Sequence, residues 1–248
     1  ENARHYFEKI LFEFPSSALA PQAAFYRAES FYLQEKYGDC IPLYSSFLTN
    51  YPTDAQKSLA LFHLAVSQFN QKEFADSAKS FGDFAQGYPA DPMAKNATLN
   101  AALCYAKALD VDNALPAYEK YVKLYPDSED VGATYLQMGQ LLEKFGQDTR
   151  AADVYRRTPS TAGEYGEALF NAGRVYRKLN KTDNEQSVYE ELQRMPKKDD
   201  PYRLAGLLQL AEIYLARNQT AKALEIYQDI AANAADEARA ALAKERIS

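Results

Sequence analysis

Hydrogen-bonding side chains recur at one position of a repeated pattern, two residues before a small Ala or Gly. The series is Tyr26, His63, Asn100, Gln137, Asn171 and Gln209. Most are carboxamides, which donate and accept hydrogen bonds at once. Such groups can pair with the backbone of an extended chain whatever its side chains are. We name this series the polar ladder and predict that it binds a partner peptide. A set of ordinary solvated side chains is the alternative interpretation.

Cationic side chains lie close to the polar ladder in the sequence. They are Lys107, Lys144, Arg174, Arg177 and Lys178. Together they predict a local basic patch that would pair with carboxylates of a partner. The alternative is a mixed, solvated surface, because Glu143 and Glu167 interrupt the series.

Aromatic side chains of the N-terminal part form a third candidate contact surface. Phe25, Tyr32, Phe62 and Phe69 could line an apolar groove for a partner helix. Rings at helical spacing also pack into protein cores, and this is the alternative for the same residues.

The sequence lacks the residue patterns of catalytic and metal sites. His5 and His63 are its only histidines, and they lie in different copies of the repeat, without metal-ligand spacing. There is no glycine-rich phosphate loop and no nucleophile elbow. The adjacent carboxylates Glu190 and Glu191 have the pattern of solvated charge. We therefore predict a protein that is not an enzyme and that has no catalytic residue, no cofactor and no metal.

Composition argues against two kinds of partner. The net charge is −6, whereas a nucleic-acid-binding protein needs a basic surface to displace counterions from phosphates. No run of about 18 apolar residues occurs, so no segment is predicted to span a membrane. The two cysteines, Cys40 and Cys104, have small or apolar neighbours. We predict buried thiols, with a disulfide or a reactive thiol as the alternative.

A period of 37 residues places these side chains on helices. An aromatic residue precedes proline at Phe14-Pro15, Tyr51-Pro52, Tyr88-Pro89 and Tyr125-Pro126, with 37 residues between successive copies. Residues spaced by four, three and four before each dipeptide are mostly apolar, which predicts a helix with one buried face. The proline ends each helix because it disfavours helical geometry in the residue before it.

Another set of helices precedes these and carries the polar ladder. Each has a small residue three positions before a residue that is aromatic in most copies. The small residues are Ala28, Ala65, Ala102, Gly139, Gly173 and Ala211. A small side chain lets the two helices of a pair approach closely. Short turns such as 35–38 join the two helices, so each pair is predicted to be an antiparallel hairpin.

Helix pairs account for most of the chain. The predicted pairs span 18–52, 54–89, 91–126, 128–159, 162–196 and 200–233. Residues 1–14 are predicted as the second helix of an incomplete pair, and residues 235–248 as a terminal helix. Since the first helix keeps an apolar stripe, we expect that the array continues towards the N-terminus or that another chain covers this edge. The fourth pair is short, which predicts a shortened second helix and an irregular loop over 158–163.

The spacing of small and aromatic residues resembles the tetratricopeptide repeat family. In the best copy the matching residues are Ala102, Tyr105, Ala114, Tyr118 and Pro126. The resemblance covers nearly the whole chain and implies an all-α, right-handed superhelical solenoid of antiparallel helix pairs. The sequence departs from the family pattern in having no Trp, in Gln68 at an aromatic position and in Glu185 at a small one.

Copies of 37 residues that end in Tyr-Pro resemble bacterial cell-envelope members of this family. These include lipoproteins of the outer-membrane β-barrel assembly machinery and periplasmic proteins associated with the Tol-Pal system. The resemblance implies a scaffold in a multiprotein complex of the periplasm or the outer membrane. It also allows a lipid anchor upstream of the present chain. A cytoplasmic location is the alternative.

The leading hypothesis is a non-enzymatic scaffold that binds an extended peptide or a partner helix in its concave groove. Two alternatives stay open: a structural subunit assembled through its ends and convex face, or the non-catalytic array of a larger enzyme. The predicted partner is a protein or a peptide rather than nucleic acid. The sequence leaves the oligomeric state open.

Overall fold

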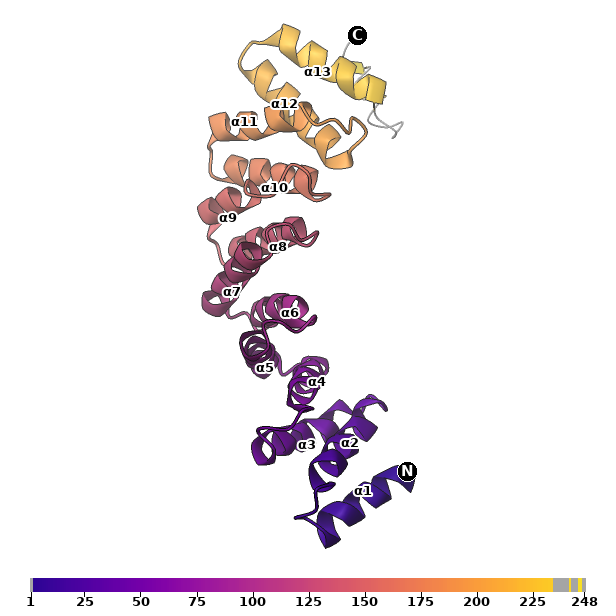
Figure 1. Cartoon of the computed structure of the whole chain (residues 1–248). Coiled ribbons are helices and arrows are strands. Elements are labelled where there is room, and N and C mark those ends of the chain that lie inside the picture. Colours follow the sequence, from indigo (N-terminus) through magenta and orange to yellow (C-terminus); the bar gives the residue numbers. More distant parts are fainter. Residues whose placement is uncertain (1, 234–240, 242–244, 247–248) are drawn as a thin grey trace. The chain divides into compact units, whose positions relative to one another are not determined.

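A computed structural model describes residues 2–233, 241 and 245–246 of the chain. The described residues form helices and contain no strand. The helices are α1 (Asn2–Glu13), α2 (Ala20–Tyr32), α3 (Tyr37–Asn50), α4 (Lys57–Asn70), α5 (Phe74–Gly87), α6 (Ala94–Lys107), α7 (Val111–Leu124), α8 (Val131–Lys144), α9 (Asp148–Tyr155), α10 (Tyr165–Lys178), α11 (Thr182–Gln193), α12 (Pro201–Ala216) and α13 (Thr220–Asn233) (Figure 1). The predicted all-α fold of stacked helix pairs is confirmed. The terminal helix predicted at 235–248 lies outside the described residues, except for 241 and 245–246.

The chain divides into two compact units, residues 1–125 with helices α1–α7 and residues 126–248 with helices α8–α13. We call the even-numbered helices A helices and the odd-numbered ones B helices. Within each unit every helix packs against the next one in the chain, as Figure 1 shows. Neighbouring A helices also contact one another, since α10 packs against both α8 and α12. Side chains at equivalent positions of successive A helices therefore lie in a row within a unit.

The small residues of the A helices leave room for aromatic rings of the B helices, which pack against them. A Cβ atom added to Gly139 would lie 2.3 Å from the ring of Tyr155, and one added to Gly173 would lie 2.2 Å from that of Tyr189. In each pair the ring follows the small residue by 16 positions. These rings are buried: Tyr44, Phe81, Tyr118, Tyr155, Tyr189 and Tyr227. The constant spacing fixes the register between the two helices of a pair.

The turn from each A helix to its B helix has one repeated backbone geometry. In the first pair the N–H of Lys36 donates to the carbonyl of Phe31, and that of Glu35 donates to the carbonyl of Tyr32. These two bonds define a Schellman motif, whose central residue adopts a left-handed conformation. The left-handed residues come seven positions after the small ones: Glu35, Lys72, Leu109, Gly146, Asn180 and Asn218. Most of these residues are not glycine, although residues with a side chain disfavour the left-handed conformation. The packing of the two helices of a pair therefore outweighs this backbone preference.

Both cysteines are free and buried, as the sequence predicts. The Sγ of Cys40 lies 3.1 Å from the hydroxyl of Ser67, and the Sγ of Cys104 lies 3.3 Å from that of Ser77. Burial raises the pKa of both thiols. They are therefore neutral core groups at physiological pH.

Buried partners accommodate the two departures from the repeat pattern. The side-chain carbonyl of Gln68 accepts a hydrogen bond of 2.7 Å from Ser80 inside the core. The carboxylate of Glu185 is only 3% exposed and accepts one of 2.7 Å from the Nε of Arg177. A polar residue is tolerated at each position because the neighbouring helix supplies its partner.

The helix α9 is shorter than its counterparts, as predicted. It has eight residues, whereas α7 has 14. The segment 158–163 after it contains no helix and leads directly into α10.

Candidate partner-binding surface

The carboxamides of the polar ladder lie on successive A helices of the second unit. Gln137 is on α8, Asn171 on α10 and Gln209 on α12, and each is partly exposed. Because α10 contacts both of its A-helix neighbours, these three side chains form a row along one side of the unit. Two residues after Gln137 and Asn171, the small residues Gly139 and Gly173 pack against B-helix rings, which fixes the backbone there.

Three ladder residues keep their hydrogen-bonding groups available. Within the described part of the chain, Asn100, Asn171 and Gln209 make no side-chain hydrogen bond to another residue. Partly exposed amides that are not committed to the fold can donate to and accept from a partner at little cost.

His63, in contrast, is committed to the fold of the first unit. Its Nδ1 lies 2.7 Å from the carboxylate of Glu29, which also accepts a hydrogen bond from the hydroxyl of Tyr44. The ring of Tyr32 stacks on the imidazole with 4.1 Å between the centroids. Burial and the nearby Glu29 raise the pKa of Tyr44 far above its usual value, so this phenol stays protonated. His63 and Tyr32 thus form part of a packed cluster, which weakens their assignment to a free binding surface.

Phe25 does not line a surface groove, and this prediction is wrong. Its side chain is only 3% exposed and packs between the rings of Tyr44 and Phe47. A position three residues before the small residue faces the B helix of the same pair, so a ring there belongs to the core. The adjacent Tyr26 is 41% exposed and stacks on Phe7 at 6.0 Å.

The cations predicted as a basic patch are largely neutralised. Arg174 binds Glu143 at 2.6 Å, Arg177 binds Glu185, and Lys178 binds Asp148 at 2.7 Å. For Arg174 and Lys178, the stacking of pairs brings the cation to a carboxylate 31 and 30 residues away, which the sequence alone does not place beside it. The predicted patch of uncompensated positive charge is therefore corrected to a set of ion pairs that link elements of the second unit.

The two remaining cations of that set differ. Lys107, in the first unit, places its Nζ 5.7 Å from the ring centroid of Phe69 and 5.9 Å from that of Phe74. Lys144 is exposed at the end of α8. Only Lys144 resembles the freely solvated cation that the prediction required.

Tyrosine-carboxylate pairs are a feature that sequence reasoning missed. The hydroxyl of Tyr155 donates to Glu143 at 2.6 Å, that of Tyr214 donates to Glu190 at 2.9 Å, and that of Tyr227 donates to Glu212 at 3.1 Å. Burial, followed by this hydrogen bond, raises the pKa of Tyr214 to about 12. These pairs hold in place the carboxylates of Glu143 on α8, Glu190 on α11 and Glu212 on α12. The tyrosine and the carboxylate of each pair are 12 to 24 residues apart in the chain, so no local sequence motif predicts the pair.

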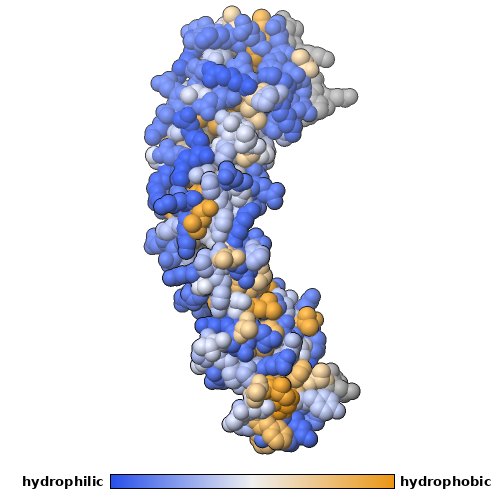
Figure 2. Space-filling view, viewed as in Figure 1, coloured by the Kyte–Doolittle hydropathy of each residue, from blue (hydrophilic) through white to orange (hydrophobic). Residues whose placement is uncertain are grey.

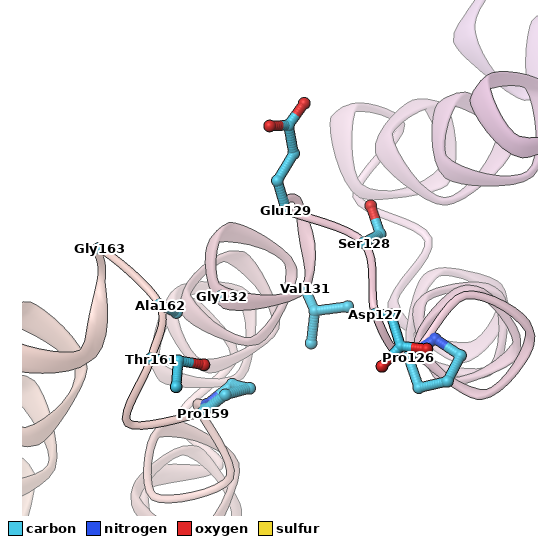
Figure 3. Close-up of a pocket in the computed structure, with 10 residues that line it drawn as sticks. All are labelled: Pro126, Asp127, Ser128, Glu129, Val131, Gly132, Pro159, Thr161, Ala162 and Gly163. Atoms are coloured by element: carbon cyan, nitrogen blue, oxygen red, sulfur yellow. The ribbon is translucent and has the colours of Figure 1, made fainter.

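A polar pocket of about 390 Å³ lies between two loops of the second unit. Pro126, Asp127 and Val131 line it from the segment before and at the start of α8, and Pro159 and Thr161 line it from the segment after the short α9 (Figure 3). The irregular loop over 158–163 lines part of this pocket, whereas no residue of the polar ladder lines it.

Sequence and structure comparisons identify the repeat. Tetratricopeptide repeat models match residues 1–55, 166–199 and 205–236. The chain is a tetratricopeptide repeat protein. The model of the outer membrane lipoprotein family YfiO matches residues 54–169 of this repeat protein.

One solved tetratricopeptide repeat structure shares the fold at low sequence identity. A tetratricopeptide repeat protein from Parabacteroides merdae is 13% identical, with a TM-score of 0.51 over 93% of this chain and 90% of that one. A structure of MamA is 15% identical, with a TM-score of 0.43 over 67% of this chain and 91% of the other. No curated protein sequence matches the chain. Among the described helices, none has the length and apolar character needed to cross a membrane.

Proposed function

We propose that this tetratricopeptide repeat protein binds an extended peptide segment of a partner protein along its polar ladder. The repeat and lipoprotein models that match the chain support a protein-interaction scaffold. The observation that carries the finer proposal is the row of partly exposed carboxamides Gln137, Asn171 and Gln209 on α8, α10 and α12.

The spacing of the row suits an extended chain. Packed helices lie about 8–10 Å apart, and an extended peptide rises about 3.3 Å per residue. Each step along the ladder therefore corresponds to roughly three residues of a bound peptide. A ladder amide could pair with the backbone of every third residue, which tolerates varied side chains and favours an extended partner over a partner helix.

We further propose that the protein works without a catalytic role in a bacterial envelope complex, in the periplasm or at the outer membrane. The match of residues 54–169 to an outer membrane lipoprotein family supports this location. Proximity labelling in the source cell tests it. Outer-membrane and periplasmic proteins should be enriched among the labelled neighbours, whereas a set dominated by cytoplasmic proteins would refute the location.

Peptide selection followed by mutation tests the ladder. Peptides that bind the wild-type chain are selected from a displayed random library, and their affinities are measured for a Gln137→Ala, Asn171→Ala, Gln209→Ala variant. Loss of one or two net hydrogen bonds per contact predicts a drop of at least about tenfold.

The matched control is Asn184→Ala, which removes an exposed carboxamide from the B helix α11 of the same unit. It should leave every affinity unchanged. If the triple variant keeps its fold by circular dichroism and binds the peptides as well as the wild type does, the ladder is not the binding surface.

A further inference from the structure

The fourth helix pair lacks two aromatic rings that earlier copies of the repeat carry. In those copies two rings pack together at the end of the B helix, with 5.4 to 5.5 Å between their centroids: Phe47–Tyr51, Phe84–Tyr88 and Tyr121–Tyr125. One period of 37 residues after the last of these pairs, the sequence has Thr158 and Ala162 instead. Two small side chains fill less space than two rings, so the fourth pair has room at this corner.

The polar pocket of about 390 Å³ lies at this corner, and Ala162 is part of its lining. The loop comes close to the start of α8, because a Cβ added to Gly132 would lie 2.6 Å from the Cβ of Ala162. Thr158, directly before the lining residue Pro159, is only 3% exposed, and its hydroxyl has no hydrogen-bond partner among the described residues. A buried hydroxyl without a partner costs free energy. The loop therefore closes on α8 without filling the pocket.

The pocket has apolar and polar walls. Val131 and Pro159 supply apolar surface, and Asp127 and Thr161 supply a carboxylate and a hydroxyl. In Figure 3, Asp127 and Val131 point to the side of their segment that faces Pro159 and Thr161, whereas the side chain of Glu129 points away. Such walls suit a side chain with an apolar stem and a positively charged end.

The carboxylate of Asp127 is not committed to the fold. It is exposed and makes no hydrogen bond or ion pair with another residue in the part of the chain that the structure describes. Elsewhere in the second unit carboxylates bind cations, as Asp183 binds Arg217 at 2.6 Å. No lysine or arginine is among the residues that line the pocket. Charge complementarity therefore favours a cationic ligand.

The cations closest to the pocket in the sequence are engaged elsewhere. Arg156 binds Glu191 at 2.9 Å. The guanidinium carbon of Arg157 lies 4.9 Å from the ring centroid of Tyr135. Figure 2 shows the visible face of the second unit, from α8 to α13, as largely hydrophilic. A charged segment of another protein suits this surface better than an apolar one.

We infer that the pocket binds a lysine or arginine side chain of a partner protein. The aliphatic stem packs on Val131 and Pro159, and the charged end donates hydrogen bonds to the carboxylate of Asp127 and the hydroxyl of Thr161. The pocket lies between loops, whereas the polar ladder lies on the A helices. The inference therefore does not depend on the proposed peptide site.

Capped single amino acids test the site without knowledge of the partner. The probes are N-acetyl-arginine methylamide and N-acetyl-lysine methylamide, and the methyl NMR signals of Val131 and Thr161 in the full 248-residue chain report binding. Saturable shifts of both signals, with a dissociation constant of about 1 mM for at least one probe, are expected for ligands of this size. N-acetyl-citrulline methylamide has nearly the shape of the arginine probe without its charge. It should bind at least about fivefold more weakly.

Variants of the lining identify the contacts. Asp127→Asn should weaken binding of the cationic probe at least about fivefold, because it removes the charge and keeps the shape of the side chain. Thr161→Phe should abolish binding by placing a ring in the pocket. The matched control is Glu129→Gln, which removes a carboxylate that points away from the pocket, and it should bind as the wild type does (Figure 3). The ladder triple variant should also bind the probe normally. All of these variants should keep the circular dichroism of the wild type.

Photo-crosslinking in the source cell identifies where the cation comes from. A photoreactive amino acid at position 161 should give an adduct heavier than the chain, with a yield that Asp127→Asn lowers and Glu129→Gln leaves unchanged. A cross-link confined to the chain itself would refute the partner. Absence of saturable shifts up to about 10 mM probe, or equal binding of the arginine and citrulline probes, would overturn the inference. Equal effects of Asp127→Asn and Glu129→Gln would also overturn it.

Discussion

At the scale of single residues, the fold depends on side chains that leave room for a ring. Gly173 has no space for a Cβ, because the ring of Tyr189 would lie 2.2 Å from it. The sequence pattern alone identifies this position as small. Only the structure shows which ring requires it to be small, because that ring lies on another helix.

Gly173→Ala should therefore destabilise the protein by about 1–3 kcal/mol through overpacking. Gly82→Ala is a matched control, since nothing lies within 4 Å of its added Cβ and Ala favours a helix by about 0.5–1 kcal/mol. Urea denaturation measures both free energies of unfolding. Equal effects of the two substitutions would show that the ring contact does not set the register.

Glu190 makes the free energy of unfolding of the second unit dependent on pH in the acidic range. The hydrogen bond from Gln186, opposed by burial and aided by that from Tyr214, holds the pKa of Glu190 below its usual value. A depressed pKa in the folded state means that the carboxylate stabilises the fold above the unfolded pKa of about 4.3. That contribution disappears as the pH falls through the folded pKa.

Between pH 7 and about pH 3, the wild type should lose more stability than Glu190→Gln does. The control is Asp153→Asn, which removes an exposed carboxylate of α9. Chemical denaturation at a series of pH values gives the comparison. A wild type and a Glu190→Gln variant with parallel pH profiles would exclude this role.

At the scale of elements, the helices and their pairing follow from the sequence, but their contacts do not. The 37-residue period, the prolines and the small residues predict the helix pairs and the short α9. The pattern could not separate Phe25, which packs into the core, from Tyr26 beside it, because both precede the same small residue. The pattern also could not predict that Glu29 contacts His63. These residues are 34 positions apart in the chain and come close only because successive helix pairs stack. The ion pairs that neutralise Arg174 and Lys178 arise in the same way.

The repeated turn between paired helices contains strain that substitution should release. Leu109 adopts a left-handed conformation with φ of 60° and is 49% exposed, so its side chain contributes little burial. Leu109→Gly should stabilise the protein by up to about 1 kcal/mol, since Gly adopts this conformation without a Cβ clash. Thermal and urea unfolding measure the gain.

Gly146→Ala provides the reciprocal control at the equivalent turn, where φ is 70°. It should destabilise by about 1 kcal/mol. A stabilising Gly146→Ala, or a destabilising Leu109→Gly, would contradict the account of the turn.

At the scale of the whole molecule, the chain is an array of repeats, and we propose that a surface of this array rather than a single pocket binds the partner peptide. Stability in such arrays is approximately a sum over neighbouring repeats. The amides of Asn100, Asn171 and Gln209 make no side-chain hydrogen bond within the described residues, so the fold does not depend on them. We propose the polar ladder as one such surface, which binds an extended peptide.

Site-specific photo-crosslinking tests the central claim, that the ladder contacts a partner, most directly. A photoreactive amino acid replaces Asn171 in one strain and Asn184 in another, and cross-linked products are compared in the source cell. We predict a discrete protein adduct at position 171 that unlabelled selected peptide competes away, and none at position 184. Adducts of equal yield at both positions, or at position 184 alone, would contradict it.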